Sequence, residues 1–425
     1  MRRGRVLTVL LLVLPPWAGA QTVDQATKDL IAKLLARIDS LESRVAQLEN
    51  SGARTAAPAA LSPAQAAHTT HDTAPLPDAA QPLYPSLKLS GFSDFNFSAT
   101  NLDGPSGGFG PQTLLGAHSG FQEGQFVLHL SSAISPKVSV FGELSLTARA
   151  DAGTETPPAP GFNPEVERLI IRYDLNDSFK VSFGRFHTPI NYWNTAFHHG
   201  QWLQTTASRP EMTQFGGSFI PVHFVGTLVE GAVPAGGLNL NYNVGLGNGR
   251  GQVISRGGDA GDINNNRAWL VNAFIKPDRL YGLQLGGSVY RDLINPLGGV
   301  ATHEWIQSAH IVWLKETPEV IAEFANVKHQ PVGGATASNS QAFYIQTAYR
   351  LPWGEKLWKP YYRLEYIHVP LSDAVFKAVP SFLGSTFGMR YDISSFAAFK
   401  MEYRHYDRRN LASINGAFLQ TSFTF

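Results

Sequence analysis

The feature that most constrains this chain is a two-residue alternation of apolar and polar side chains, which recurs from residue 84 to the C-terminus. In Val138–Arg149, for example, Leu144 and Leu146 alternate with Glu143 and Ser145. Successive side chains of a strand point to opposite faces, so this pattern predicts strands with one apolar face. Helical periodicity is absent from this part of the chain, and the fold class is therefore predicted to be all-β.

Sixteen such segments can be counted, and they begin near residues 87, 121, 138, 166, 179, 222, 238, 268, 280, 303, 319, 341, 359, 383, 397 and 416. The connections after odd-numbered segments are long, whereas those after even-numbered segments are mostly short. Long and short connections that alternate over an even number of antiparallel strands are typical of an outer-membrane barrel. Residues 86–425 are therefore predicted to form a sixteen-stranded antiparallel transmembrane β-barrel, with its apolar outer face in outer-membrane lipid.

Two soluble folds compete with this interpretation. A β-sandwich buries its apolar faces between two sheets, and sixteen strands would make it unusually large. A β-helix would show a fixed short repeat, which the sequence lacks. The chain also ends on AFLQTSFTF, an alternating stretch that runs up to Phe425. Such an ending is expected of a barrel, because the last strand must pair with the first where no open edge can exist.

The N-terminal residues 1–20 have the features of a secretory signal peptide. Arg2, Arg3 and Arg5 precede a short apolar run, and Ala18-Gly19-Ala20 fits a cleavage site. The apolar run is too short for a membrane-spanning helix, so export with cleavage before residue 21 is predicted. Cleavage lowers Lys+Arg from 34 to 31 against 33 Asp+Glu, so the formal charge changes from +1 to −2. This balance gives no indication of a nucleic-acid partner.

Residues 21–50 are predicted to form a periplasmic coiled-coil helix that drives self-association. Apolar residues follow the 3, 4, 3, 4, 3 spacing of a heptad seam, at Ile31, Leu34, Ile38, Leu41, Val45 and Leu48. Arg37 and Glu42 occupy flanking positions suited to salt bridges in a parallel oligomer. An amphipathic helix lying on its own domain is the alternative, and the seam alone leaves dimer and trimer open. Residues 51–85 are rich in Ala, Pro and Thr and are predicted to be a linker.

The stretch VSFGRFHTPINYW at residues 181–193 contains G-[QR]-F-x-T-P at the end of a predicted strand. In this motif and in its overall organisation, the chain resembles the trimeric phosphate-selective O/P porins of Gram-negative outer membranes and related porins with an N-terminal coiled coil. The resemblance implies passive ion and solute transport through a barrel whose third loop, here near 186–221, folds inward and narrows the pore. The terminal Phe425 similarly resembles the C-terminal signal that the barrel-assembly machinery reads.

The third loop and the strand before it supply the candidate pore constriction. These candidates are Arg185, His187, His198, His199, Gln201, Trp202, Gln204, Arg209 and Glu211. One interpretation is that they contact small polar solutes or anions; the other is that they hold the loop against the inner wall. His198 and His199 have no third ligand at a suitable spacing, and two further histidines lie in the linker, so neither a metal site nor a cofactor is expected.

The faces that the alternation directs inward carry charges of both signs. The basic residues are Arg168, Arg172, Arg350, Lys359, Arg363, Arg390, Lys400 and Arg404, and the acidic ones are Glu143, Asp174, Glu323, Glu365, Asp392 and Glu402. Phosphate-selective porins line their pore with many lysines, and this chain departs from that pattern. The mixture therefore does not support phosphate selectivity and fits either a transverse field or salt bridges between strands.

The expected function is weakly selective diffusion of small hydrophilic solutes or anions across the outer membrane. A structural anchor without an open pore is an alternative, in which the helix of residues 21–50 acts as a tether. An outer-membrane hydrolase is the third class, but the nucleophile elbow G-x-S-x-G is absent and the histidines are scattered. The chain is therefore not expected to be an enzyme.

Overall fold

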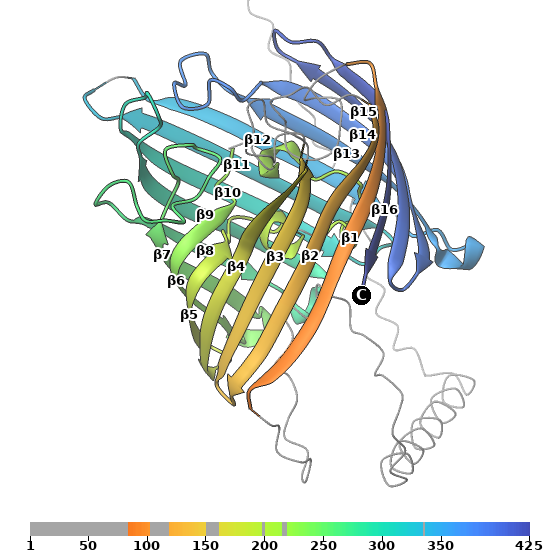
Figure 1. Ribbon diagram of the computed structural model, residues 1–425, viewed down its shortest axis with the longest axis horizontal. Helices are drawn as coiled ribbons and strands as arrows, with labels where there is room; N and C mark the ends of the chain where they lie inside the picture. The colour runs from red at the N-terminus through yellow and green to blue at the C-terminus, as the bar shows by residue number, and fades with distance from the viewer. Residues whose placement is uncertain (1–83, 103–118, 150–160, 198–199, 215–218, 335) are drawn as a thin grey trace, which may run out of the picture. The chain divides into compact units, whose positions relative to one another are not determined.

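The computed structural model describes residues 84–102, 119–149, 161–197, 200–214, 219–334 and 336–425 (Figure 1). The predicted signal peptide and coiled coil, and the predicted linker up to residue 83, lie outside these residues, as do His198 and His199. Within the described ranges, no helix is long and apolar enough to cross a membrane.

Sixteen strands form one closed antiparallel barrel, in which each strand pairs with its neighbours in sequence and β1 pairs with β16 (Figure 1). Their bounds are β1 Ser86–Thr100, β2 Gly120–Ser135, β3 Val138–Arg149, β4 Gly161–Asn176, β5 Phe179–His187, β6 His223–Val233, β7 Leu240–Asn248, β8 Ala268–Ile275, β9 Leu283–Ile294, β10 Thr302–Leu314, β11 Glu319–Pro331, β12 Ser338–Ala348, β13 Trp358–His368, β14 Phe382–Ser394, β15 Ala397–Arg408 and β16 Ile414–Thr424. The predicted number of strands and their antiparallel closure are confirmed.

The largest difference from the predicted boundaries is at β4, which begins at Gly161 rather than near residue 166. The stretch 161–165 contains Gly161 and Pro164, which are typical of a loop when read locally. Here the stretch pairs with the end of β3, from Arg149↔Gly161 to Ser145↔Glu165. Pairing with a neighbouring strand therefore overrides the local preference of these residues.

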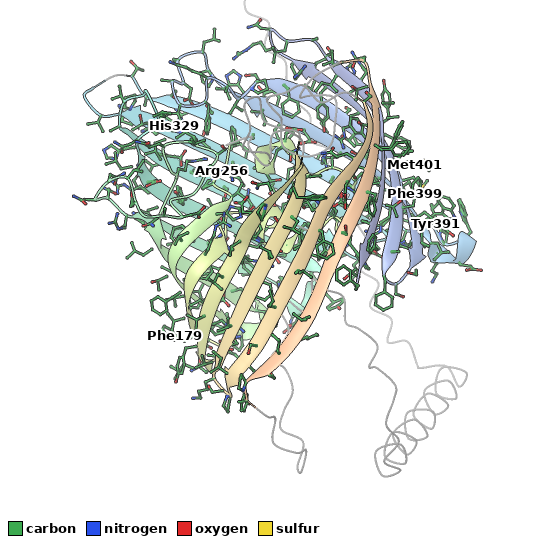
Figure 2. All side chains as sticks on the ribbon, viewed as in Figure 1. Phe179, Arg256, His329, Tyr391, Phe399 and Met401 are labelled. Carbon is green, nitrogen blue, oxygen red and sulfur yellow. The ribbon has the colours of Figure 1, made fainter. Side chains whose placement is uncertain are left out.

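Side chains alternate between the two faces of the wall, and β12 shows this most clearly. Tyr344 and Gln346 are buried, whereas Phe343 and Ile345 are 38% and 40% exposed. Figure 2 shows the same outward direction for other large side chains, including Phe179, Phe399 and Met401. An outward apolar face opposite an inward polar face is the arrangement of a membrane-spanning barrel wall.

The C-terminal residue takes part in the closure of the barrel. Phe425 donates its backbone N–H to the Gly91 carbonyl at 3.0 Å, and Gly91 donates in return at 2.9 Å. The Phe425 ring stacks on Phe126 with 5.7 Å between centroids. A Cβ atom at Gly91 would lie 2.5 Å from the Val127 carbonyl oxygen and 2.7 Å from the Phe425 ring. The absence of a side chain at residue 91 therefore lets the terminal aromatic ring pack at the closing seam.

Candidate functional site

The connection from β5 to β6, residues 188–222, is held first by Glu323 on β11. It contains a short helix α3 (Trp193–Ala196) and a 3₁₀ turn η2 (Glu211–Thr213). Tyr192 and Trp193 both donate backbone N–H groups to Glu323 Oε1, at 2.8 and 2.6 Å. The first N–H groups of a helix have no partner within the helix, and here the Glu323 carboxylate accepts hydrogen bonds from two such groups. Glu323, which the sequence placed on an inward face, thus fixes the start of this connection.

Three buried cations from the strands β13, β14 and β15 hold the second half of the connection. Arg363 donates to the carbonyl oxygens of Ser208 and Arg209 at 2.8 and 3.1 Å. Arg390 donates to the carbonyl oxygens of residues 202 and 204 at 2.8 and 2.9 Å, and Lys400 donates to those of residues 201 and 206. Backbone carbonyls removed from water require donors, and these side chains supply them.

Carboxylates on the same strands receive the N–H groups of the connection. Glu402 Oε2 accepts from Ala207 at 3.1 Å and from Ser208 at 3.4 Å, and Glu365 Oε2 accepts from Glu211 at 2.6 Å. In the closed order of strands, β13 is eight strands from β5, which is the opposite side of a barrel of sixteen. The connection therefore reaches from the wall at β5 to the facing wall.

The structure pairs most of the predicted lumen charges with one another, and it pairs Lys359 with Glu319, which was not predicted. The nitrogen–oxygen distances are 2.6 Å for Arg168–Glu143, 2.8 Å for Arg172–Asp174, 2.6 Å for Lys359–Glu319, 2.7 Å for Arg363–Glu365, 2.7 Å for Arg390–Asp392 and 2.6 Å for Arg404–Glu402. Four of these pairs join residues two apart on one strand, because such residues share a face. Pairing of opposite charges therefore explains the mixture of signs better than an extended transverse field.

Arg350 lies outside the strands but forms an ion pair with Asp392, another predicted lumen charge. It follows the end of β12 and belongs to the short turn of residues 349–357. There it forms an ion pair with Glu316 in the neighbouring turn at 3.0 Å. Burial acts to raise the pKa of the Glu316 carboxyl, but hydrogen bonds and charge from Arg350 and Lys359 prevail and lower it to about 2. This group of charges links two short turns at one end of the barrel.

The predicted constriction residues of the connection contact several walls. Gln201 Nε2 donates to Gln125 Oε1 on β2 at 2.8 Å, and Trp202 Nε1 donates to the Phe396 carbonyl between β14 and β15 at 2.8 Å. Gln204, Arg209 and Glu211 also lie in the connection, the first two buried. The side chains of Gln201 and Trp202 therefore attach the connection to the wall.

Burial changes the protonation of Glu211 in this connection. It raises the pKa of the Glu211 carboxyl to about 7, and the nearby Glu365 charge acts in the same direction. A carboxyl with this pKa is half protonated near neutral pH. Glu211 consequently contributes less negative charge to this part of the interior than its residue type suggests.

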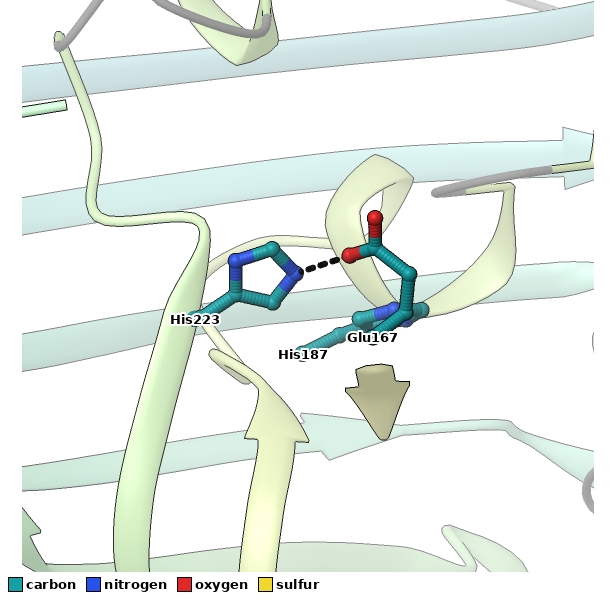
Figure 3. Close-up of side chains that lie close together, drawn as sticks. All are labelled: Glu167, His187 and His223. Atoms are coloured by element: carbon teal, nitrogen blue, oxygen red, sulfur yellow. Dashed lines mark ion pairs between the residues drawn. The ribbon is translucent and has the colours of Figure 1, made fainter. Parts of the chain in front are cut away.

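Two predicted constriction residues, Arg185 and His187, lie on β5. His187 belongs to a cluster that the sequence analysis did not find. Glu167, His187 and His223 lie at neighbouring positions on β4, β5 and β6 (Figure 3), and three of their possible ligand atoms lie within 4.8 Å of one another. Arg185 adjoins them and forms ion pairs with Glu165 and Asp259, both at 2.9 Å. The residue spacing carries no metal motif, and only the strand register, which pairs His187 with His223, brings the three together.

A closed sixteen-stranded barrel with an apolar outer face and a long connection attached to its inner wall defines the fold of the bacterial outer-membrane porins. Solved structures agree with this class. An anion-selective porin from Comamonas acidovorans matches with a TM-score of 0.58 and 11% identity over 80% of this chain and 100% of that one. OmpF of Salmonella typhi, in a complex with daunomycin, matches with a TM-score of 0.53 and 12% identity. The outer-membrane channel DcaP of Acinetobacter baumannii matches with a TM-score of 0.52 and 12% identity. Each match covers 80% of this chain and 97% of the other.

At these identities the similarity establishes the fold alone. No protein-family profile matches the sequence, and no curated protein matches it.

Proposed function

We propose that this protein is an outer-membrane porin through which small hydrophilic solutes diffuse passively. The observation that carries the proposal is the attachment of residues 188–222 to the wall facing β5, through Glu323, Arg363 and Glu402. In this proposal, the connection held across the closed barrel narrows the lumen and leaves a water-filled passage beside it. The inward polar faces supply a surface that water and polar solutes can wet.

Weak ion selectivity follows from the charge pairs. A ring of one sign sets a strong preference for the opposite ion. The wall of this barrel instead alternates cation and anion, as in Arg363–Glu365 and Arg404–Glu402. We therefore expect reversal potentials close to zero in salt gradients, with any preference a small one, and no phosphate selectivity despite the motif shared with the O/P porins.

The remaining parts of the proposal concern assembly. A trimer in the outer membrane, with the helix of residues 21–50 in the periplasm, fits the heptad seam and the return of both barrel ends to one side. A structure of similar fold, the trimer form of OmpT of Vibrio cholerae, with a TM-score of 0.51 and 12% identity to this chain, supports the proposed trimer. Phe425 is proposed to mark the chain for the barrel-assembly machinery.

Single-channel recording in planar bilayers tests this function. The purified protein should give stepwise conductance, and deletion of residues 200–210 with a Gly-Ser closure should raise the size of each step, because the deleted residues span the lumen. The matched control is a replacement of the exposed residues 297–300, in the loop between β9 and β10, by Gly-Ser, which should leave the step size nearly unchanged. A folded barrel without current would favour the structural anchor, and equal steps with and without residues 200–210 would contradict the constriction.

A further inference from the structure

The cluster of Glu167, His187 and His223 offers the donor atoms of a transition-metal site. Two imidazoles and one carboxylate form the protein ligands of many zinc sites, in which water or a further side chain completes a tetrahedron. Imidazole favours zinc and its neighbours over calcium and magnesium, which prefer oxygen ligands. We infer that this cluster binds one divalent transition-metal ion, with Zn²⁺ as the best-suited ion.

A β-bulge directs Glu167 into the barrel. Glu143 pairs with Arg168, and the next residue of β3 pairs with Val166, so Glu167 is an extra residue in β4. Val166 and Leu169 are 51% and 57% exposed on the outer face, whereas Glu167 between them is 3% exposed. Bulges often re-aim a side chain next to a functional site. Without this bulge, the strict alternation of β4 would not place both Glu167 and Arg168 inside.

The distances within the cluster need only small changes to hold an ion. His223 Nε2 lies 2.8 Å from Glu167 Oε2. Tetrahedral zinc with bonds of about 2.0–2.1 Å separates its donor atoms by about 3.3 Å. The three ligand atoms all lie within 4.8 Å of one another, so each must shift by about an ångström or less, which side-chain rotation provides. A fourth donor is near, since Glu143 Oε2 is 3.4 Å from His187 Nε2.

Arg185 competes with the metal ion for the same groups. Its Nη2 donates to His223 Nδ1 at 3.0 Å, and its Nη1 is 3.8 Å from Glu167 Oε2. A guanidinium only donates, so His223 accepts at Nδ1 and carries its proton on Nε2, which donates to Glu167. Metal binding at Nε2 requires this proton to pass to solvent while Nδ1 takes up a proton from solvent. Arg185 then loses its acceptor on His223 and keeps its ion pairs to Glu165 and Asp259.

The position of the site links it to the 188–222 connection. His187 directly precedes this segment, and His223 directly follows it. A bound ion would therefore tie both ends of the connection to β4. His223 also lines a small cavity together with Val222, Arg256 and Gly257.

Calorimetry on the full-length protein in detergent, stripped with a chelator and titrated with Zn²⁺, tests the site. The wild type should bind one equivalent more than the variant H187Q/H223Q. E167Q should weaken this binding by about tenfold or more, and R185Q should strengthen it because the competing cation is gone. The matched control is H405Q, which removes an exposed histidine 3.3 Å from its own carboxylate partner Asp407 and should change nothing.

Co²⁺ absorption provides the second measurement. A tetrahedral site should give visible bands in the wild type that are lost in H187Q/H223Q; identical spectra, or identical Zn²⁺ stoichiometry and affinity in the two proteins, would overturn the inference. If the double variant fails to fold, the test depends on the single variants, in which Zn²⁺ affinity should fall for E167Q and rise for R185Q. Unchanged Zn²⁺ affinity in both single variants would refute the site. None of these measurements uses channel current, so the site and the proposed porin function can fail separately.

Discussion

The replacement of Arg363 by methionine tests how residues 188–222 are held in place. Arg363 is fully buried and donates to the carbonyl and the hydroxyl of Ser208, both at 2.8 Å, and to Glu365 at 2.7 Å. Methionine keeps much of the volume of this side chain but none of its donors. Removing one partner of a buried ion pair costs about 3–5 kcal/mol, because the remaining charge stays buried without its counterion.

Most of this cost is expected to appear as weaker attachment of the connection, because four of the six acceptors of Arg363 belong to it. At about 1.36 kcal/mol per factor of ten, a loss of about 3 kcal/mol corresponds to roughly 150-fold more frequent detachment. Hydrogen exchange measured by mass spectrometry reports this opening directly. The N–H groups of Ala207 and Ser208, which donate to Glu402, should lose protection by about this factor.

Arg172→Met is the matched control. Arg172 on β4 forms its ion pairs with Asp174 of the same strand at 2.8 Å and with Glu230 of β6 at 3.5 Å, both of which belong to the wall. The R172M variant should therefore leave the hydrogen exchange of residues 200–214 unchanged. If R363M shows the same protection of these residues as the wild type, the cations of β13–β15 do not hold the connection, and the reasoning is wrong.

Two further predictions concern other parts of the chain. I38D/L41D should lower the oligomeric state in detergent, measured by light scattering, because aspartates at seam positions oppose a coiled coil; an unchanged mass would mean that the barrels associate unaided. Burial acts to raise the pKa of Asp373, but hydrogen bonds from His329 and Ser340 hold it below its ordinary 3.8. Its stabilisation of residues 369–381 is therefore complete above about pH 4 and is lost as the pH falls through the lowered pKa. After correction for intrinsic rates, the N–H groups of Val375 and Phe376, which donate to Asp373 Oδ1, should lose protection in that acid range; D373N should remove this pH dependence, and a wild type with pH-independent protection would contradict it.

The strands of this protein could be predicted from the sequence because each carries its own signal. The alternation in β12 and β15 reports directly which side chains meet lipid and which face inward, since strand geometry has a period of two. The unequal connections then indicate antiparallel neighbours and closure. Local reading failed at β4, where pairing with β3 extended the strand through Pro164.

The partners of the inward side chains could not be predicted in the same way. Sequence alone placed Arg363 and Glu402 on inward faces and left open whether such charges make a transverse field or form salt bridges between strands. Arg363 is more than 150 residues away along the chain from its partner Ser208, and Glu402 is likewise more than 150 residues away from its partner Ala207. Such contacts depend on the registers of many strands at once, to which no local pattern is sensitive.

The sequence by itself thus determined the class of fold, the two faces of the wall and the long connection after β5. Only the tertiary structure decided which cations hold that connection. It also decided that a β-bulge turns Glu167 inward, where this residue lies close to His187 and His223. The physical reason is that alternation is a property of each strand, whereas a site joins several strands and depends on how they are aligned.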